Sequence, residues 1–387
     1  MDCPGRPEAT LGEMGDELLM HLGTRRFPLG GSFELTERCN LACLHCFINQ
    51  PAGSREAAAR ELTLPQVTSV LDRIAGAGCL FLLLTGGEPL LRPDFCDIYR
   101  YAKQKGILVS LFTNGTLLSP PIADFLAEWR PVAVEITLYG ATQETYERVT
   151  QVPGSFARCM RGIELALDRG LRLNLKSVLM EANRHELEGM RGLAEQLGVP
   201  YRFDGTLFPR LDGREIPLAQ RLSPGDVVAF DRQYPERQQE FDRLYRDFGA
   251  TPVRSEYVFG CGAGYRTFHV DSAGRLSVCM MARRPAYDLL EGSFQAGWEE
   301  FLGPVLRKKR ALDTPCRTCT VGALCTQCPG WSQLAHGDDE TPVEYMCEMG
   351  RLRAAQAAAS AGTCAQTEHV LRPGEERRVS VRTGPPD

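Results

Sequence analysis

The sequence predicts an α/β fold in which about six short parallel strands alternate with helices, followed by a Cys-rich segment. Over residues 32–205, short apolar runs alternate with amphipathic segments, and Gly or Pro separates them. Strand and helix patterns that alternate in this way are typical of a parallel sheet covered by helices. Six units, rather than the eight of a closed barrel, favour an open or partial TIM-type barrel, (β/α)6.

The predicted strands are short apolar runs rich in β-branched or aromatic residues. They cover residues 32–36, 80–85, 108–113, 133–138, 171–178 and 201–203. Helical patterns fill the intervals, at residues 64–77, 94–104, 120–128, 156–169 and 184–197. In such a barrel the functional groups gather at the carboxyl ends of the strands.

The rest of the chain is organised around this barrel. We expect an N-terminal extension, the barrel, a polar helical bridge, a Cys-rich domain, and a helical extension with a tail of disorder-prone composition. These segments span residues 1–31, 32–220, 221–255, 256–350 and 351–387. The Cys-rich domain shows little regular patterning, and a small domain of that kind needs metal to hold it together.

Charge and hydropathy exclude several classes of function. The net charge of -5 and the pI of about 5.8 do not favour binding to nucleic acid or to an anionic membrane. The N-terminus lacks an apolar run of signal-peptide length, and the longest apolar run, 79–84, is too short to span a bilayer. These features predict a soluble cytoplasmic protein. In such a chain, fifteen cysteines favour metal binding over disulfides.

The first group of cysteines follows the first predicted strand. Cys39, Cys43 and Cys46 lie in "TERCNLACLHC" with the spacing C-x3-C-x2-C. Three thiolates can bind three irons of a 4Fe–4S cube and leave the fourth iron open for chemistry. A zinc site completed by a residue such as His45 is the alternative.

A second motif, "TGGEP" at residues 85–89, ends the next strand and should therefore lie near the cysteine loop. Glycines let backbone approach a ligand closely, and Glu88 can accept hydrogen bonds from an ammonium group. Together the two motifs resemble those of the radical SAM superfamily. The resemblance implies that Cys39, Cys43 and Cys46 bind a 4Fe–4S cluster whose open iron chelates S-adenosylmethionine. One electron then cleaves this cofactor, and the 5′-deoxyadenosyl radical abstracts a substrate hydrogen.

The resemblance also implies a set of cofactor contacts. The GGE residues would receive the methionine amino group, His45 would pack near the adenine, and polar residues at strand ends would contact the rest of the cofactor. These positions are Gly86, Gly87, Glu88, His45, Thr113, Asn114 and Thr137. Lys176 is a candidate partner for a carboxylate, and Asp204 is a weaker candidate for a general base.

The second group of cysteines resembles the SPASM extension of this superfamily, with one departure, because Cys325 and Cys328 are separated by two residues rather than three. The resemblance implies two auxiliary 4Fe–4S clusters with interlaced ligands. The outer cluster would be held by Cys316, Cys319, Cys325 and Cys347, and the inner cluster by Cys261, Cys279 and Cys328. A zinc ribbon built from "CRTCTVGALCTQC" alone would leave three of these cysteines unused.

The inner cluster would have three visible thiolates. Either His269 or Asp271 completes it, or one iron stays open. Both residues lie in "FHVDSAGRL", which also reads as a β-hairpin with a turn at residues 271–274.

Enzymes with a SPASM extension mostly modify peptides and proteins. We therefore expect an oxidoreductase of the peptide (RiPP) maturase type, which installs a crosslink, through a thioether or a C–C bond, or another oxidative modification. The segment before the first strand is too short for a peptide-recognition domain, so a separate leader-peptide-binding protein is expected if a leader is read. Flavodoxin or ferredoxin would supply electrons.

Two alternatives remain open for the substrate. One is side-chain oxidation of a protein, as in anaerobic sulfatase maturation, and the other is a small-molecule or cofactor pathway. A non-enzymatic electron carrier would need no GGEP motif.

Overall fold

The computed structural model describes residues 25–48, 50–248 and 256–364. Its centre is a nine-stranded sheet with the strand order β11-β10-β9-β1-β4-β5-β6-β7-β8. The six predicted strands are the consecutive block β1 (Gly30–Glu34), β4 (Phe81–Thr85), β5 (Leu108–Thr113), β6 (Val134–Thr137), β7 (Leu173–Val178) and β8 (Tyr201–Asp204). Every neighbouring pair in this block is parallel, which confirms the predicted partial barrel.

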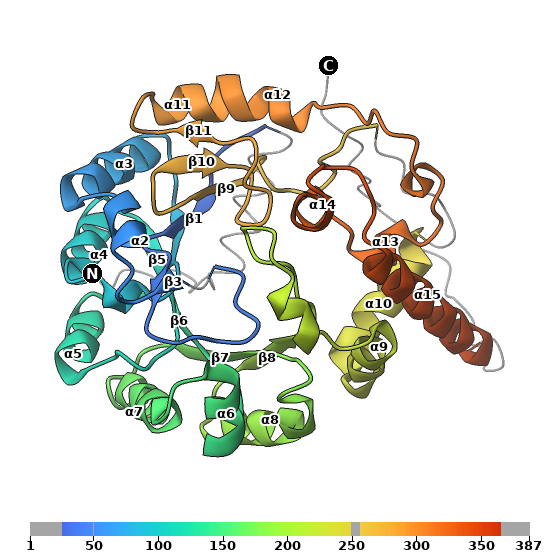
Figure 1. The fold of residues 1–387 in the computed structure, drawn as a ribbon, viewed down its shortest axis with the longest axis horizontal. Coiled ribbons are helices and arrows are strands. Elements are labelled where there is room, and N and C mark those ends of the chain that lie inside the picture. The colour runs from blue at the N-terminus through green and yellow to red at the C-terminus, as the bar shows by residue number, and fades with distance from the viewer. Residues whose placement is uncertain (1–24, 49, 249–255, 365–387) are drawn as a thin grey trace, which may run out of the picture.

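Helices cover the outer face of this curved sheet (Figure 1). They are α2 (Arg55–Arg60), α3 (Leu64–Gly76), α4 (Phe95–Gln104), α5 (Pro120–Glu128), α6 (Gln143–Thr150), α7 (Ser155–Asp168) and α8 (Leu187–Gln196), with short 3-10 turns η1 (Pro89–Leu91) and η2 (Arg184–Glu186). The five predicted helices are confirmed, and α2 and α6 are additional.

The strands bury one face against these helices. Leu82 and Leu84 of β4 and Leu111 of β5 are at most 1% exposed, and they belong to one apolar core with Leu71 and Ile74 of α3. Successive side chains of a strand point to opposite faces, so the residues between these leucines face the concave side of the barrel. The concave side is therefore the face on which polar and cofactor-binding groups can gather.

Local sequence signals set the ends of these helices. α3 starts with a capping box, in which Thr63 and Gln66 satisfy each other's backbone N–H groups. α5 starts with Pro120, directly after the N-cap residue Ser119. At the first position of a helix the backbone N–H has no partner within the helix, so proline loses no hydrogen bond there. These signals set the residue at which each of these two helices begins.

The Cys-rich part has more regular structure than the sequence predicts. β9 (Thr267–Val270) pairs in parallel with β1, and β10 (Arg275–Ser277) and β11 (Tyr287–Asp288) extend the same sheet as antiparallel strands. The predicted hairpin is confirmed, since Gly274 N donates to Asp271 O at 3.0 Å and Gly274 has a φ of 82°. The sheet of the barrel thus continues into residues 267–288.

The remaining helices lie beside the open side of the barrel or over β9–β11 (Figure 1). They are η3 (Ile216–Gln220), α9 (Pro224–Gln233), α10 (Pro235–Phe248), α11 (Phe294–Ala296), the π-helix η4 (Gly297–Leu302), α12 (Gly303–Leu306), η5 (Pro315–Arg317), α13 (Gly322–Cys325), α14 (Pro329–His336) and α15 (Glu344–Cys364). A small second sheet pairs β2 (Arg38–Cys39) with β3 (Gln50–Pro51).

Several predicted segments lie outside the described residues. These are most of the N-terminal extension, the end of the polar bridge at 249–255, and the tail at 365–387. Among the helices that the structure does describe, none combines the length and the apolar character needed to cross a membrane.

Candidate functional site

The loop after β1 carries Cys39, Cys43 and Cys46, and their thiols lie within electrostatic range of one another. Burial, with smaller contributions from the charges of Glu88 and Cys46, raises the pKa of Cys39 to about 12. Burial, followed by the charges of Cys46 and Cys39, also raises the pKa of Cys43 well above its usual value. Metals bind the thiolate, so a group of thiols of which Cys39 and Cys43 resist ionisation suits a site in which a cationic group lowers their pKa.

Asn114, which directly follows β5, contacts the cysteine loop through its side chain. Its Nδ2 lies 3.6 Å from Cys39 Sγ and donates to Asn40 Oδ1 at 3.0 Å. Its Oδ1 accepts a hydrogen bond from Thr116 N at 2.9 Å. Hydrogen bonds to a ligating sulfur tune a cluster and orient its ligand. The structure therefore places Asn114 at the cysteine loop.

The two glycines of the TGGEP motif allow the end of β4 to touch the cysteine loop. A Cβ atom on Gly86, whose φ is 145°, would lie 2.3 Å from Thr36 O, and one on Gly87 would lie 2.3 Å from Arg38 O. Gly87 N donates to Thr36 O at 2.7 Å, and Glu88 N donates to Arg38 O at 2.9 Å. The motifs that the sequence predicts to be neighbours are thus in direct backbone contact.

Glu88 is fully buried and already has protein partners. Its carboxylate accepts hydrogen bonds from Thr113 Oγ1 at 2.7 Å, Asn114 N at 2.7 Å and Leu90 N at 3.0 Å. Burial raises the pKa of Glu88 to about 7, against the lowering effect of these three bonds. A carboxylate has about four lone-pair sites, so about one remains for an ammonium donor. Glu88 therefore also fixes the end of β4 to the end of β5, a role that the sequence does not reveal.

His45 lies against Tyr139, with ring centroids 5.0 Å apart. Burial lowers the pKa of His45 to about 4, so its ring is neutral at neutral pH. Tyr139 follows β6, whose last residue, Thr137, is 9% exposed. A neutral His45 packed on Tyr139 agrees with packing rather than acid catalysis.

The concave face also holds a charged group on β6, β7 and β8. Glu135 Oε2 lies 2.6 Å from Arg202 Nη2 and 3.5 Å from Lys176 Nζ. The Lys176 ammonium also lies over the ring of Phe112, and burial lowers its pKa to about 7. Lys176 therefore already faces a protein carboxylate. Asp204, the other predicted candidate here, is exposed and accepts a hydrogen bond from Thr206 N at 2.8 Å.

The thiols predicted for the outer auxiliary cluster affect one another electrostatically. Burial raises the pKa of Cys325, and the charges of Cys319 and Cys316 raise it further. Burial, with smaller contributions from Cys316 and Cys325, raises the pKa of Cys347 to about 11. Cys347 on α15 thus lies near Cys316 and Cys325.

The thiols predicted for the inner cluster form a second group. Burial raises the pKa of Cys328 to about 11, and Cys279 and Cys261 contribute to the shift. Cys328 is only three residues from Cys325, yet its cysteine neighbours are those of the other group. The thiol of Cys328 is therefore influenced by Cys279 and Cys261.

Neither group has the geometry of a single-ion site. Within the described ranges, no three His, Cys, Asp or Glu side chains are close enough together to hold one metal ion. A zinc ion would bring its sulfur ligands to about 2.3 Å from one centre, whereas the thiolates of a 4Fe–4S cube each bind a different iron. The zinc alternatives therefore gain no support from this geometry.

His269 and Asp271, the predicted candidates for a fourth ligand, both have other contacts. Asp271 accepts hydrogen bonds from the N–H groups of Ala273 and Arg275 in the hairpin turn, each at 3.0 Å. His269 is fully buried, its Nδ1 lies 2.9 Å from Ser32 Oγ, and its Nε2 lies 3.9 Å from Glu34 Oε2. His269 thus faces β1 on the concave side of the barrel.

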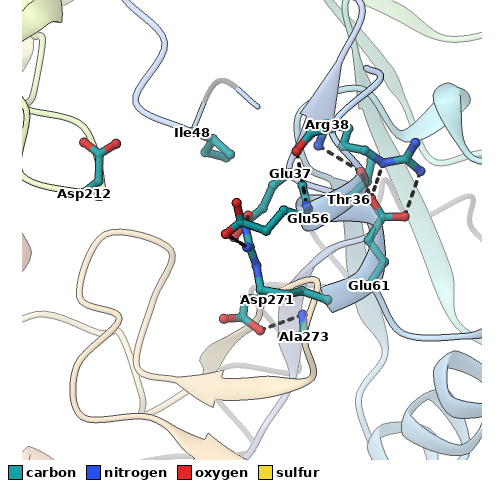
Figure 2. A network of polar contacts seen from close by, with 12 residues as sticks. Thr36, Glu37, Arg38, Ile48, Glu56, Glu61, Asp212, Asp271 and Ala273 are labelled. Atoms are coloured by element: carbon teal, nitrogen blue, oxygen red, sulfur yellow. Dashed lines mark hydrogen bonds and ion pairs between the residues drawn. The ribbon is translucent and has the colours of Figure 1, made fainter. Parts of the chain in front are cut away.

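Two ion pairs near the site are not predicted from the sequence. Glu34 on β1 pairs with Arg283, whose Nη2 lies 2.6 Å from Glu34 Oε2. Glu61 pairs with Arg38, immediately before Cys39 (Figure 2). The two residues of each pair are far apart in sequence, so the sequence does not reveal the pairing. For Glu34 alone there is a local signal, because the alternation of side chains along β1 places it on the face opposite the buried Phe33.

Known proteins resemble this chain in both sequence and fold. Residues 33–194 match the Radical SAM superfamily. The AdoMet-dependent heme synthase of Methanosarcina barkeri is 29% identical over 79% of this chain and 93% of its own length. The mycofactocin maturase MftC of Mycobacterium tuberculosis is 31% identical over 70% of each chain.

Among solved structures, Streptococcus suis SuiB bound to its precursor peptide SuiA superposes with a TM-score of 0.64. The match covers 89% of this chain and 84% of SuiB. At 14% identity, this similarity shows the fold alone. The similarity to MftC and the match of residues 33–194 to the superfamily agree with the two motifs that follow β1 and β4. The chain therefore belongs to the radical SAM superfamily, whose members bind a 4Fe–4S cluster and S-adenosylmethionine.

Proposed function

We propose that this enzyme uses the 5′-deoxyadenosyl radical to oxidise a peptide, forming a crosslink or another modification with net loss of hydrogen. The main structural support for radical chemistry is the backbone contact between the two motifs, in which Gly87 N and Glu88 N donate to carbonyls of the cysteine loop. The mycofactocin maturase among the relatives and the fold of a peptide-bound neighbour support a peptide as substrate.

In this proposal Cys39, Cys43 and Cys46 bind the cluster that holds the cofactor. Bound together, cluster and cofactor supply the radical after one-electron reduction. Around them, the chain contributes backbone and polar side chains that bind and orient the cofactor: Gly86, Gly87, Glu88, Thr113, Asn114, Thr137 and His45. Glu88 has about one acceptor site free for the methionine ammonium, and Asn114 connects that site to Cys39.

We assign seven further cysteines, all within residues 261–347, to two auxiliary clusters. Cys316, Cys319, Cys325 and Cys347 would hold the outer one, and Cys261, Cys279 and Cys328 the inner one. The mutual pKa shifts within each group support this division. Because Asp271 accepts hydrogen bonds in the hairpin turn and His269 is bonded to Ser32, we favour an inner cluster with one iron not bound by protein side chains.

The proposed partners follow from this chemistry. Flavodoxin or ferredoxin would supply the electron for cofactor cleavage, and a separate small protein would present the leader of a substrate that carries one. We place the enzyme in the cytoplasm, where reduced thiols persist. We divide the chain as the sequence suggests, with residues 32–220 as the barrel and residues 256–350 as the auxiliary-cluster domain.

A test of the substrate class uses the reconstituted enzyme with S-adenosylmethionine and a reductant. Short peptides encoded next to this chain's gene serve as substrates, and mass spectrometry follows the peptide. We expect loss of two hydrogen atoms per modification and one 5′-deoxyadenosine per event. If every such peptide stays unmodified while the cofactor is cleaved, the peptide assignment is wrong.

One observation favours a second candidate, a small-molecule substrate. The heme synthase relative matches over 93% of its length, more than the maturase does. The same assay with an iron porphyrin in place of the peptide separates the two candidates. Consumption of the porphyrin with matching 5′-deoxyadenosine would favour the second.

A further inference from the structure

A buried ion pair lies directly behind the cysteine loop. Glu61 follows α2, and its side chain is only 8% exposed. Arg38, the residue before Cys39, donates to both oxygens of Glu61, from Nε at 2.7 Å and from Nη2 at 2.9 Å. A bidentate pair of this kind fixes both position and orientation. Figure 2 shows the carboxylate of Glu61 between Arg38 and Thr36.

Thr36 is the third member of this network, and it is fully buried. Its hydroxyl donates to Glu61 and accepts a hydrogen bond from Arg38 N at 2.9 Å. Arg38 also donates to Ala52 O at 3.1 Å. The network therefore holds the backbone of residues 36–38 through both side chains, and three of its hydrogen bonds end on the carboxylate of Glu61.

The backbone carbonyls of Thr36 and Arg38 accept hydrogen bonds from the TGGEP turn. Thr36 O accepts from Gly87 N at 2.7 Å, and Arg38 O accepts from Glu88 N at 2.9 Å. The two backbones are in close contact, because a Cβ atom on Gly86 would lie 2.3 Å from Thr36 O and one on Gly87 would lie 2.3 Å from Arg38 O. A shift of Thr36 or Arg38 would thus shift the turn that faces the cofactor.

We propose that Glu61 is a positioning residue for S-adenosylmethionine. Through Arg38 and Thr36 it fixes the two carbonyls that hold the Gly86–Glu88 turn against the cysteine loop. The carboxylate of Glu61 pairs with Arg38, Thr36 and, at 4.0 Å, with Arg92. It acts on the backbone before the cysteines, so cluster assembly and cofactor binding respond differently to its loss. The inference rests on the proposed site at Cys39, Cys43 and Cys46, and it is independent of the substrate.

The experiment compares the full chain with Glu61→Gln, which keeps the size and removes the charge. Glu56→Gln is the matched control, because Glu56 lies on α2, pairs with Arg60 and is 88% exposed. Three quantities are measured without any peptide. They are iron per chain, the dissociation constant for S-adenosylmethionine, and hydrogen exchange of a peptide covering residues 81–92.

For Glu61→Gln we expect unchanged iron content, faster exchange at the Gly87 and Glu88 amides, and a dissociation constant raised by about 10- to 100-fold, as for other residues that orient a metal site from behind its ligands. The electron paramagnetic resonance change that S-adenosylmethionine causes in the reduced cluster should weaken accordingly. Glu56→Gln should match the parent in all of these measurements.

A cofactor affinity within twofold of the parent in Glu61→Gln overturns the proposal. If this variant loses iron, Arg38→Lys takes its place, because lysine keeps the charge but cannot form the bidentate pair. An unchanged affinity in Arg38→Lys then has the same meaning. Failure of the peptide assignment would leave these results untouched, whereas loss of the proposed cluster site would appear as unchanged iron and cofactor cleavage in a Cys39, Cys43 and Cys46 triple variant.

Discussion

Single atoms decide whether the two motifs can meet. Gly87→Ala would place a Cβ atom 2.3 Å from Arg38 O, a backbone atom that cannot rotate away. We expect S-adenosylmethionine binding to fall at least tenfold and stability to fall by about 1–3 kcal/mol, the usual cost of overpacking. Gly53→Ala is the control, since a Cβ atom there meets nothing within 4 Å. Calorimetry and cofactor titration check both, and equal behaviour of the two variants would contradict the close-approach argument.

Lys176 gives the concave face a pH-dependent contribution to stability. Burial lowers its pKa from 10.5 to about 7, against the raising effect of Glu135. Between these values the unfolded chain binds more protons than the folded chain, so the unfolding free energy rises with pH from about 7 towards 10.5. Below about pH 7 the cost of burying the charged amine is fully present. The slope of the rise is at most about 1.4 kcal/mol per pH unit.

Lys176→Met should therefore flatten the increase in unfolding free energy between pH 7 and pH 9. Denaturant titrations of the apoprotein measure this slope, and the cysteines titrate equally in parent and variant. Lys103→Met, on the outer helix α4, is the control. A slope in Lys176→Met equal to that of the parent would show that the amine stays charged beside Glu135.

At the scale of elements, the sequence predicts those features that a local pattern carries. The six parallel strands and five helices were predictable because each has its own apolar period and its own glycine or proline boundary. Helices α2 and α6, with six and eight residues, are too short to show a period. The pairing of β9 with β1 has no local signal, because Ser32 and His269 meet across more than two hundred residues.

The same reasoning applies to the site. The thiols and the GGEP turn were predictable because motif spacing and strand order bring them together. The internal partners of Glu88 and the pair of Glu61 with Arg38 were not, because a buried carboxylate is matched to its donors only in three dimensions. These hidden partners are what hold the predicted residues in place.

The contact of α15 with α13 gives a prediction for the outer auxiliary cluster. A Cβ atom on Gly350 would lie 2.5 Å from Cys325 Cβ, so Gly350→Ala should push Cys347 away from Cys325. We expect a loss of about four irons per chain, the content of one 4Fe–4S cluster, with cofactor cleavage retained. Gly192→Ala on α8 has open space at Cβ and should instead gain about 0.5–1 kcal/mol. Unchanged iron in Gly350→Ala would argue against ligation by Cys347.

At the scale of the molecule, one continuous sheet connects the cofactor loop after β1 with the hairpin that precedes Cys279. Three 4Fe–4S clusters would give about twelve irons per chain, and a content near four would remove both auxiliary clusters. Quantitative iron analysis of the anaerobically reconstituted protein checks this number. The proposal needs the higher value, because the auxiliary clusters accept the electron that the oxidised peptide loses.

The central claim is that the loop with Cys39, Cys43 and Cys46 cleaves S-adenosylmethionine. The most direct test measures 5′-deoxyadenosine formed by the reduced enzyme without substrate, in the parent and in the variant with all three cysteines changed to Ala. Cys96→Ala on α4, outside both cysteine groups, is the control. We predict product from the parent and from Cys96→Ala and none from the triple variant. Product from the triple variant at the parental rate would contradict the account.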